Sequence, residues 1–253
     1  MALENLRREA QENLRLLTNN EYPGRGIILG RSLDGSRLIQ AYWLMGRSEN
    51  SRNRVLQQRG ATVRTAAADP AKLEDPSLVI YAAMRESAGH YLVSNGAQTD
   101  ALAEGIAAGK SFQEVLLAWR HEPDEPHWTP RIAGDLALEG DRAGAQLALI
   151  KADPFDPARS LHQFFHFEVL EPGFGWCVTT YRGNRNPLLS FTGEPYLMPL
   201  VESAELLADA LWNHLNGENR VALAVKAIDP VAGKASVVIR NRLTAKKGAA
   251  RHG

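Results

Sequence analysis

The amino-acid sequence predicts an α+β protein in which antiparallel strands form sheets that pack on each other, with helices outside. Short apolar segments occur in pairs separated by turn residues, which predicts hairpins. Helical segments stand in separate blocks, whereas a doubly wound parallel sheet would need strands and helices to alternate. The 253 residues are 44% hydrophobic and 23% charged. This is the composition of a globular protein that can build a large core.

Helical periodicity and capping residues predict four helices. Near the N-terminus, leucine and alanine recur at helical spacing from Leu6 to Leu17 among charged residues, and Pro23 and Gly24 follow. Ser111, with Glu114 three residues later, is typical of a capping box at the start of a helix. The predicted helices cover residues 2–18, 98–109, 111–120 and 202–216.

Apolar runs bounded by turn residues predict the strands. Turn residues at 33–36, 87–89 and 139–141 predict hairpins, and two polar segments, 46–54 and 121–131, are predicted to be loops. The predicted strands cover residues 26–30, 38–45, 61–65, 78–84, 90–94, 132–138, 145–150, 163–170, 176–181, 188–192, 220–228 and 235–242.

Composition excludes several classes of protein. The 29 Lys and Arg residues balance 29 Asp and Glu residues, which argues against binding nucleic acid or an anionic membrane mainly through bulk charge. No segment approaches the roughly 18 apolar residues of a membrane helix, so we expect a soluble cytoplasmic protein. The single cysteine, Cys177, excludes an internal disulfide and a cysteine-rich metal cluster. Its apolar surroundings predict a buried, inert thiol.

Three polar clusters stand at the ends of predicted strands or helices. The first joins residues 22–26 to residues 46–54 and is dense in arginine, hydroxyl and amide donors, which suit a phosphate or a carboxamide. The plainer interpretation is an exposed loop that pairs with surface acids. The donors of this cluster are Arg25, Arg47, Ser48, Asn50, Arg52, Asn53 and Arg54.

The second cluster is Tyr81 together with Asn95, Gly96 and Thr99. An Asn-Gly pair before a helix exposes backbone N–H groups that can receive an anion. The same pair is more often a simple turn, and a tyrosine in an apolar strand is more often a core residue.

The third cluster is the proline-rich segment 121–131, in which three acids stand close together. Carboxyl groups held near one another can have raised pKa values and act as acid or base. The histidines and acids here could also bind a metal, but their spacing lacks the helical histidine pair that zinc enzymes favour, so we predict no metal. The residues concerned are His121, Glu122, Asp124, Glu125, His127 and Arg131.

In this order, the clusters resemble the archaeal-type IMP cyclohydrolase family. The resemblance covers residues 22–195 and, more loosely, the later strands. Compared with the family pattern, this chain has about 20 additional residues before the first matching segment, WTPR in place of NTPR, and one inserted residue before it. The matching segments are YPGRG (22–26), AYW–GRSENSR (41–52), IYAAMR (80–85), LVSNGAQTD (92–100), EPDEPHWTPRI (122–132), TYRGN (180–184) and TGEP (192–195).

The resemblance implies a four-layered αββα sandwich like that of N-terminal-nucleophile hydrolases, in a single domain over residues 22–242. Residues 1–21 would be a helical extension and residues 243–253 a flexible basic tail. It further implies dehydrative closure of 5-formamidoimidazole-4-carboxamide ribotide to IMP, the last step of purine synthesis, with no metal or organic cofactor. The implied partner is the purine ribonucleotide substrate, with no nucleic acid and no membrane, and a homo-oligomer is left open.

Matching positions imply the site residues. Arg52 would align the amide and formyl oxygens, Tyr81 would donate a proton to the departing hydroxyl, and either Glu122 or Glu125 would accept the amide proton. The inserted residue leaves the choice between these two acids open. The residues expected to hold phosphate, ribose or base are Arg25, Arg47, Ser48, Asn95, Gly96, Thr129 and Arg131.

Two alternatives come from other classes of protein. One is a different purine-nucleotide-processing hydrolase on the same scaffold, which would open a ring or remove a formyl group. The other is a non-catalytic nucleotide- or RNA-binding module that uses the arginine-rich loop. An RNA-binding module is disfavoured because the chain has no net positive charge and no stripe of aromatic residues.

Overall fold

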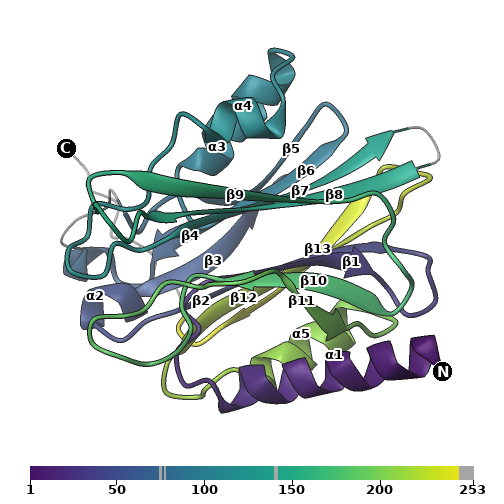
Figure 1. The fold of residues 1–253 in the computed structure, drawn as a ribbon, viewed down its shortest axis with the longest axis horizontal. Coiled ribbons are helices and arrows are strands. Elements are labelled where there is room, and N and C mark those ends of the chain that lie inside the picture. Colours follow the sequence, from purple (N-terminus) through teal and green to yellow (C-terminus); the bar gives the residue numbers. More distant parts are fainter. Residues whose placement is uncertain (74–75, 77, 140–141, 245–253) are drawn as a thin grey trace, which may run out of the picture.

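Two antiparallel sheets form the centre of the computed structural model, which describes residues 1–73, 76, 78–139 and 142–244. This confirms the predicted α+β class (Figure 1). The six-stranded sheet has the order β11 (Tyr196–Pro199), β10 (Phe174–Thr179), β1 (Gly26–Arg31), β2 (Leu38–Met45), β12 (Arg220–Ile228), β13 (Ala235–Asn241). The seven-stranded sheet has the order β3 (Arg54–Arg59), β4 (Thr62–Ala67), β5 (Ala82–Ser87), β6 (His90–Ser94), β7 (Arg131–Glu139), β8 (Arg142–Ala152), β9 (Ser160–Phe167).

The main core lies between the two sheets. Ile27 and Leu29 of β1 pack in one cluster with Val93 of β6 and Leu136 of β7. β1 packs tightly on Gly134 of β7, where an added Cβ would lie 3.0 Å from the Leu29 side chain and 3.2 Å from the Ile27 side chain. Alternate residues of β1 point into this core because successive side chains of a strand face opposite sides of its sheet.

Helices cover the outer faces of the sheets (Figure 1). α1 (Ala2–Asn19) and α5 (Ala204–His214) pack on the six-stranded sheet, where Leu17 and Leu211 join a cluster with Ile28 and Trp43. α3 (Gln98–Ala107) and α4 (Phe112–Leu116) pack on the seven-stranded sheet. No described helix is long and apolar enough to cross a membrane.

The first predicted helix agrees with the structure to within one residue at each end, and the capping box of the third predicted helix is present. Ser111 accepts a hydrogen bond from the backbone of Glu114, and the Glu114 side chain accepts from the backbone of Ser111. The capping residues act within one helical turn, so the sequence predicts them well. Residues 140–141 of the hairpin turn predicted at 139–141 and residues 245–253 of the predicted tail lie outside the described residues.

The predictions for several strands were wrong in detail. The 46–54 loop contains a single helical turn, α2 (Glu49–Arg52), and leads into β3, an edge strand that the sequence analysis missed. No strand forms at 188–192, where Leu188 and Phe191 are buried from an irregular segment and β11 follows instead. β9 begins and ends three residues earlier than predicted. Apolar residues bury equally well from a loop, so an apolar run alone does not specify a strand.

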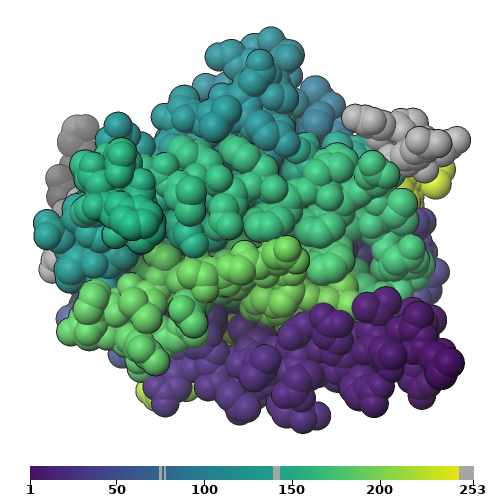
Figure 2. Space-filling view, in the orientation of Figure 1, coloured from purple at the N-terminus to yellow at the C-terminus, as the bar shows by residue number. Residues whose placement is uncertain are grey.

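The segment after β10 lies beside α1. Asn20, directly after α1, donates from its side-chain amide to the carbonyl of Arg182 at 3.2 Å. Figure 2 shows α1 in purple along the lower edge of the molecule, with the light-green chain next to it. α1 and this segment therefore form one surface.

Candidate active site

The site forms where the segment before β1 meets the loop before β7. Thr180 and Tyr181 donate from their backbones to the carbonyls of Arg25 and Pro23, at 2.9 and 3.1 Å. Gly24 has a positive φ of 76°, and an added Cβ there would lie 2.2 Å from the Thr180 hydroxyl oxygen. Only glycine accommodates both the positive φ and the close approach of Thr180, which explains the glycine between Pro23 and Arg25.

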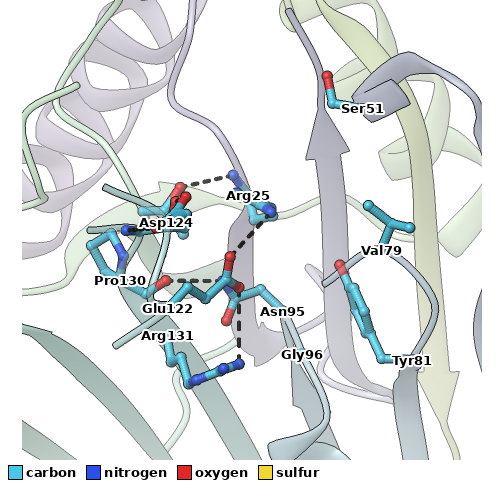
Figure 3. Close-up of polar contacts among 12 residues, drawn as sticks. Arg25, Ser51, Val79, Tyr81, Asn95, Gly96, Glu122, Asp124, Pro130 and Arg131 are labelled. Atoms are coloured by element: carbon cyan, nitrogen blue, oxygen red, sulfur yellow. Dashed lines mark hydrogen bonds and ion pairs between the residues drawn. The ribbon is translucent and has the colours of Figure 1, made fainter. Parts of the chain in front are cut away.

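Glu122 is the central carboxyl group of the site. Its side chain is 2% exposed and lies between two guanidinium groups, with Oε2 3.7 Å from Arg25 Nη2 and Oε1 3.9 Å from Arg131 Nη1 (Figure 3). Oε1 accepts no hydrogen bond in the described structure. Burial raises the pKa of Glu122, while Arg25 and Arg131 oppose that shift. Glu122 therefore has the properties of an acid or base rather than of a tightly bonded structural ion.

Arg25 connects this carboxyl group to the tyrosines of the site. Burial alone would lower the pKa of Arg25. Glu122, Tyr181 and Tyr81 together raise it by more than burial lowers it, so the pKa lies above its usual value and the guanidinium stays charged. Its Nε is buried and donates no hydrogen bond in the described structure. An unpaired buried N–H is costly, which indicates a group kept ready for a ligand.

Tyr81 lies just before β5, in a hydrogen-bonded pair with Tyr42 of β2 whose two hydroxyl oxygens are 2.6 Å apart. The Tyr81 backbone N donates to the Thr65 hydroxyl at 2.8 Å, and the Thr65 backbone N donates to the Tyr81 carbonyl at 3.0 Å. These bonds fix the ring at the end of the seven-stranded sheet. In Figure 3, Tyr81 and Val79 face Arg25, Glu122 and Asn95 across the site.

Arg54, to which the sequence analysis gave no individual role, belongs to this buried group. It is 1% exposed, its Nε donates to the Ser51 carbonyl at 2.8 Å, and its Nη1 is buried without a hydrogen-bond partner in the described structure. Burial lowers the pKa of Arg54, and the neighbouring Tyr81 opposes that shift. An arginine directly before the apolar pair Val55 and Leu56 was the signal that could have marked it as buried.

Three residues predicted from the first cluster lie apart from Glu122. Arg52 donates to the Gly46 carbonyl at 2.9 Å and to Asn219 Oδ1 at 3.1 Å. Arg52 also lines a cavity of about 410 Å³ next to α2. Arg47 lies over the Tyr22 ring, 5.0 Å from its centroid. Ser48 is exposed and caps α2.

The predicted residues of the other two clusters brace the site. Asn95 donates to the Pro130 carbonyl at 2.9 Å and accepts from the Ile132 backbone at 2.8 Å, so its amide holds the loop to the sheet. Arg131 donates to Gln98 Oε1 at 3.0 Å. Gly96 lies against Arg131, because an added Cβ would be 2.5 Å from Nη1. The Asn95–Pro130 bond is drawn in Figure 3.

The structure separates the two candidate glutamates. Glu122 is buried, whereas Glu125, three residues later, is exposed. The histidines of the loop bond to protein groups, His121 Nδ1 to the Ser160 hydroxyl at 2.8 Å and His127 Nδ1 to the Leu188 backbone N at 3.2 Å. Among the described residues, no three His, Cys, Asp or Glu side chains gather as metal ligands would.

Cys177 on β10 is fully buried, and burial raises its pKa to about 12. A thiol with such a pKa is not ionised at neutral pH and is a poor nucleophile. The prediction that Cys177 is buried is therefore confirmed.

A cavity of about 750 Å³ adjoins the site, between α1 and residues 179–196. It shares Tyr181 with the site, because the Tyr181 hydroxyl contacts the Thr129 hydroxyl of the 121–131 loop. The site itself brings one buried carboxyl group together with three buried arginines, Arg25, Arg54 and Arg131. Such a group can bind an anionic ligand and move a proton within it.

A family model and two curated proteins that this chain resembles are all named after the same enzyme. Residues 22–233 match the family model described as IMP cyclohydrolase-like protein. An IMP cyclohydrolase of Methanopyrus kandleri is 31% identical over 166 residues, which cover 63% of this chain and 75% of that protein. An IMP cyclohydrolase of Methanocaldococcus jannaschii is 26% identical over 213 residues, which cover 82% of this chain and 94% of that protein. α1 lies outside the matched residues.

Proposed function

Because the chain belongs to the IMP cyclohydrolase-like family, we propose that it closes 5-formamidoimidazole-4-carboxamide ribotide to IMP with loss of water. The observation that supports this most directly is the buried Glu122 between Arg25 and Arg131. The reaction needs a proton acceptor for an amide nitrogen and cations for a developing oxyanion. Glu122 supplies the first and the two guanidinium groups the second.

Ring closure is an attack within one bound molecule. The carboxamide nitrogen of the substrate forms a bond to its own formyl carbon, and the nitrogen loses a proton. The formyl oxygen of the resulting tetrahedral intermediate takes up a proton and becomes a hydroxyl group. This hydroxyl group gains a further proton and leaves as water, while the former formamido nitrogen loses its proton and forms the C=N double bond of the new ring. An amide nitrogen is a weak nucleophile, so holding the two groups in contact supplies much of the acceleration, on the order of 7–11 kcal/mol for well-oriented partners.

Glu122 takes the amide proton in this scheme. Its raised pKa makes it a stronger base than an ordinary carboxylate, although a smaller fraction is ionised at a given pH. Arg25 and Arg131 stabilise its ionised form. Glu125 is exposed, and this favours Glu122 as the base.

Tyr81 is our candidate for the proton donor to the leaving hydroxyl. Its hydrogen bond with Tyr42 orients the phenol. We extend the arginine role expected for Arg52 to Arg54, because Arg54 is buried beside Tyr81 and retains an unpaired Nη1. Arg52 remains a candidate that acts from the neighbouring cavity.

The remaining predicted residues are proposed to bind phosphate, ribose or base. Arg47 lies over the Tyr22 ring and Ser48 caps α2, so both would act from the edge of the site. The single backbone N–H of Gly96 donates to the Ser94 hydroxyl at 3.4 Å, so we propose that Gly96 contributes by leaving room for the Arg131 guanidinium. Asn95 and Thr129 have their side chains engaged by the protein, so we propose that they shape the binding surface.

We also propose that the two sheets with helices outside correspond to the four-layered αββα sandwich of N-terminal-nucleophile hydrolases. The cyclisation scheme needs no terminal nucleophile, because the attacking atom belongs to the substrate.

The test is incubation of the purified protein with the formamido ribotide, with IMP measured by absorbance and chromatography. We expect IMP to form at a rate proportional to enzyme concentration. Formation of the deformylated ribotide would favour a different hydrolase on the same scaffold. Binding without any product would favour a nucleotide-binding module, and both outcomes would contradict the proposal.

A further inference from the structure

We propose that Asp124 is a positioning residue that holds Glu122 at the correct distance from Arg25. The inference rests on the proposed function, since it assigns Asp124 a part in placing the proposed base. Asp124 is half-buried and lies two residues after Glu122 in the 121–131 loop. Its carboxylate is engaged by the protein at both oxygens.

The hydrogen bonds of Asp124 close the loop into a ring. Thr129 donates from its backbone N to Asp124 Oδ1 at 2.6 Å and from its hydroxyl to Asp124 Oδ2. The carbonyl of Thr129 in turn accepts from the backbone N of Glu122 at 2.9 Å. The backbone of Glu122 is therefore tied to Thr129, and Thr129 is tied to Asp124.

A second contact connects this ring to the segment that carries Arg25. The Thr129 hydroxyl contacts the Tyr181 hydroxyl, and the Tyr181 backbone N donates to the carbonyl of Pro23 at 3.1 Å. Tyr181 also stacks on Tyr22, with ring centroids 5.9 Å apart. A continuous series of contacts thus begins at Asp124 and runs through Thr129 and Tyr181. It connects the loop that carries Glu122 to the segment that carries Arg25.

The carboxylate of Asp124 also acts on Glu122 through its charge. Besides burial, four charged groups shift the pKa of Glu122: Arg25, Arg131 and Arg54 lower it, and Asp124 raises it. Removal of the Asp124 charge should therefore lower the pKa of Glu122. The pKa of Glu122 can therefore be measured in Asp124 variants, and it reports on the surroundings of Glu122 rather than on whether the protein is folded.

The experiment compares Asp124→Ala with Asp124→Asn. Asparagine can still accept from the Thr129 backbone N and can donate to the Thr129 hydroxyl, which can then donate to Tyr181, so the ring is kept while the charge is lost. Alanine loses both bonds. Asp34→Ala is the matched control, because Asp34 accepts from the Ser36 backbone N at 3.0 Å and from two serine hydroxyls in a turn without site residues.

We expect Asp124→Ala to lower kcat about 10- to 100-fold, as a displacement of about 1 Å can do. Asp124→Asn should recover most of kcat, while the acid limb of its pH profile for kcat/KM moves to lower pH. Asp34→Ala should keep the wild-type kcat and profile. Equal loss of kcat in the alanine and asparagine variants, or wild-type kcat in Asp124→Ala, would overturn the inference.

A second measurement is independent of turnover. Carbon-13 NMR of glutamate carboxyl groups, assigned with Glu122→Gln, reports the titration of Glu122 directly. We expect its pKa to decrease in Asp124→Asn and to approach the ordinary value of 4.5 in Asp124→Ala, as the loop opens. An unchanged titration in both variants contradicts the inference. A wild-type protein that makes no IMP contradicts the proposed function instead, and the NMR titration still decides the role of Asp124.

Discussion

Lys226 and Glu122 are both buried charged residues, but the two regions around them differ. Lys226 on β12 donates to Glu86 at 2.7 Å and to the Ala61 carbonyl at 3.1 Å, and it faces the Tyr91 ring. Glu122 has two ion pairs within the described part of the chain, at 3.7 and 3.9 Å, and there its Oε1 accepts no hydrogen bond.

This difference in hydrogen bonding distinguishes a buried charge with a structural role, Lys226, from a buried charge in a candidate active site, Glu122. A buried charge that has all its partners joins the two sheets and has nothing left to offer a ligand. A buried charge with incomplete partners costs stability, and proteins tolerate that cost mainly where function requires it. The predictions below test this distinction.

The largest effect is expected at Glu122. Glu122→Gln keeps the shape of the side chain but cannot accept the amide proton, so we expect kcat/KM to decrease by about 10²–10⁴-fold. Glu125→Gln should have a far smaller effect because Glu125 is exposed. Steady-state kinetics with the formamido ribotide measures both, and a larger loss in Glu125→Gln would reverse the assignment.

The two arginines of the first cluster provide the next test. Arg54→Met removes a buried cation beside Tyr81 but keeps an apolar stem, and we expect a loss of about 10²–10³-fold in kcat. Arg52→Ala should cost about tenfold or less, because Arg52 bonds to Gly46 and Asn219. Circular dichroism and thermal melting of each variant show whether the fold is retained. Losses of equal size would mean that burial does not distinguish the two arginines.

Lys226→Met should lower stability and leave activity unchanged, whereas Glu122→Gln should lower activity. It removes two hydrogen bonds and leaves Glu86, which is 30% exposed and can reach water. We expect the free energy of unfolding to decrease by about 1–3 kcal/mol. Urea titration measures this change, and kcat should stay at the wild-type value. A Lys226→Met enzyme that is stable but inactive would break the comparison.

The smallest effect is the pH dependence of stability. The pKa of Glu122 is higher in the folded than in the unfolded state, so folding favours the protonated carboxyl group. Its contribution is fully present below the unfolded value near 4.5 and is lost as pH rises through the higher folded pKa. Glu122→Gln should therefore gain stability relative to wild type over that interval. Thermal melts of both proteins between about pH 4 and pH 8 test this, and parallel curves would contradict it.

The sequence by itself determined the helices α1, α3, α4 and α5, most hairpins and the segments that meet in the site. Caps such as Ser111 and turn residues such as those at 33–36 act within a few residues, so their signal is local. The polar residues of the YPGRG segment and of the 121–131 loop predicted both as parts of a functional site. In the structure the charges of these two segments meet, because Arg25 and Glu122 form an ion pair at 3.7 Å.

Only the tertiary structure decided which individual side chains enter the buried group. Glu122 and Glu125 are chemically identical, and so are Arg52 and Arg54, in stretches without clear periodicity. Their burial depends on how the 121–131 loop closes on Thr129 and on β3 pairing at the edge of its sheet. Contacts between residues distant in the chain set both features. The same reason explains why Leu188 and Phe191 are buried without forming the predicted strand.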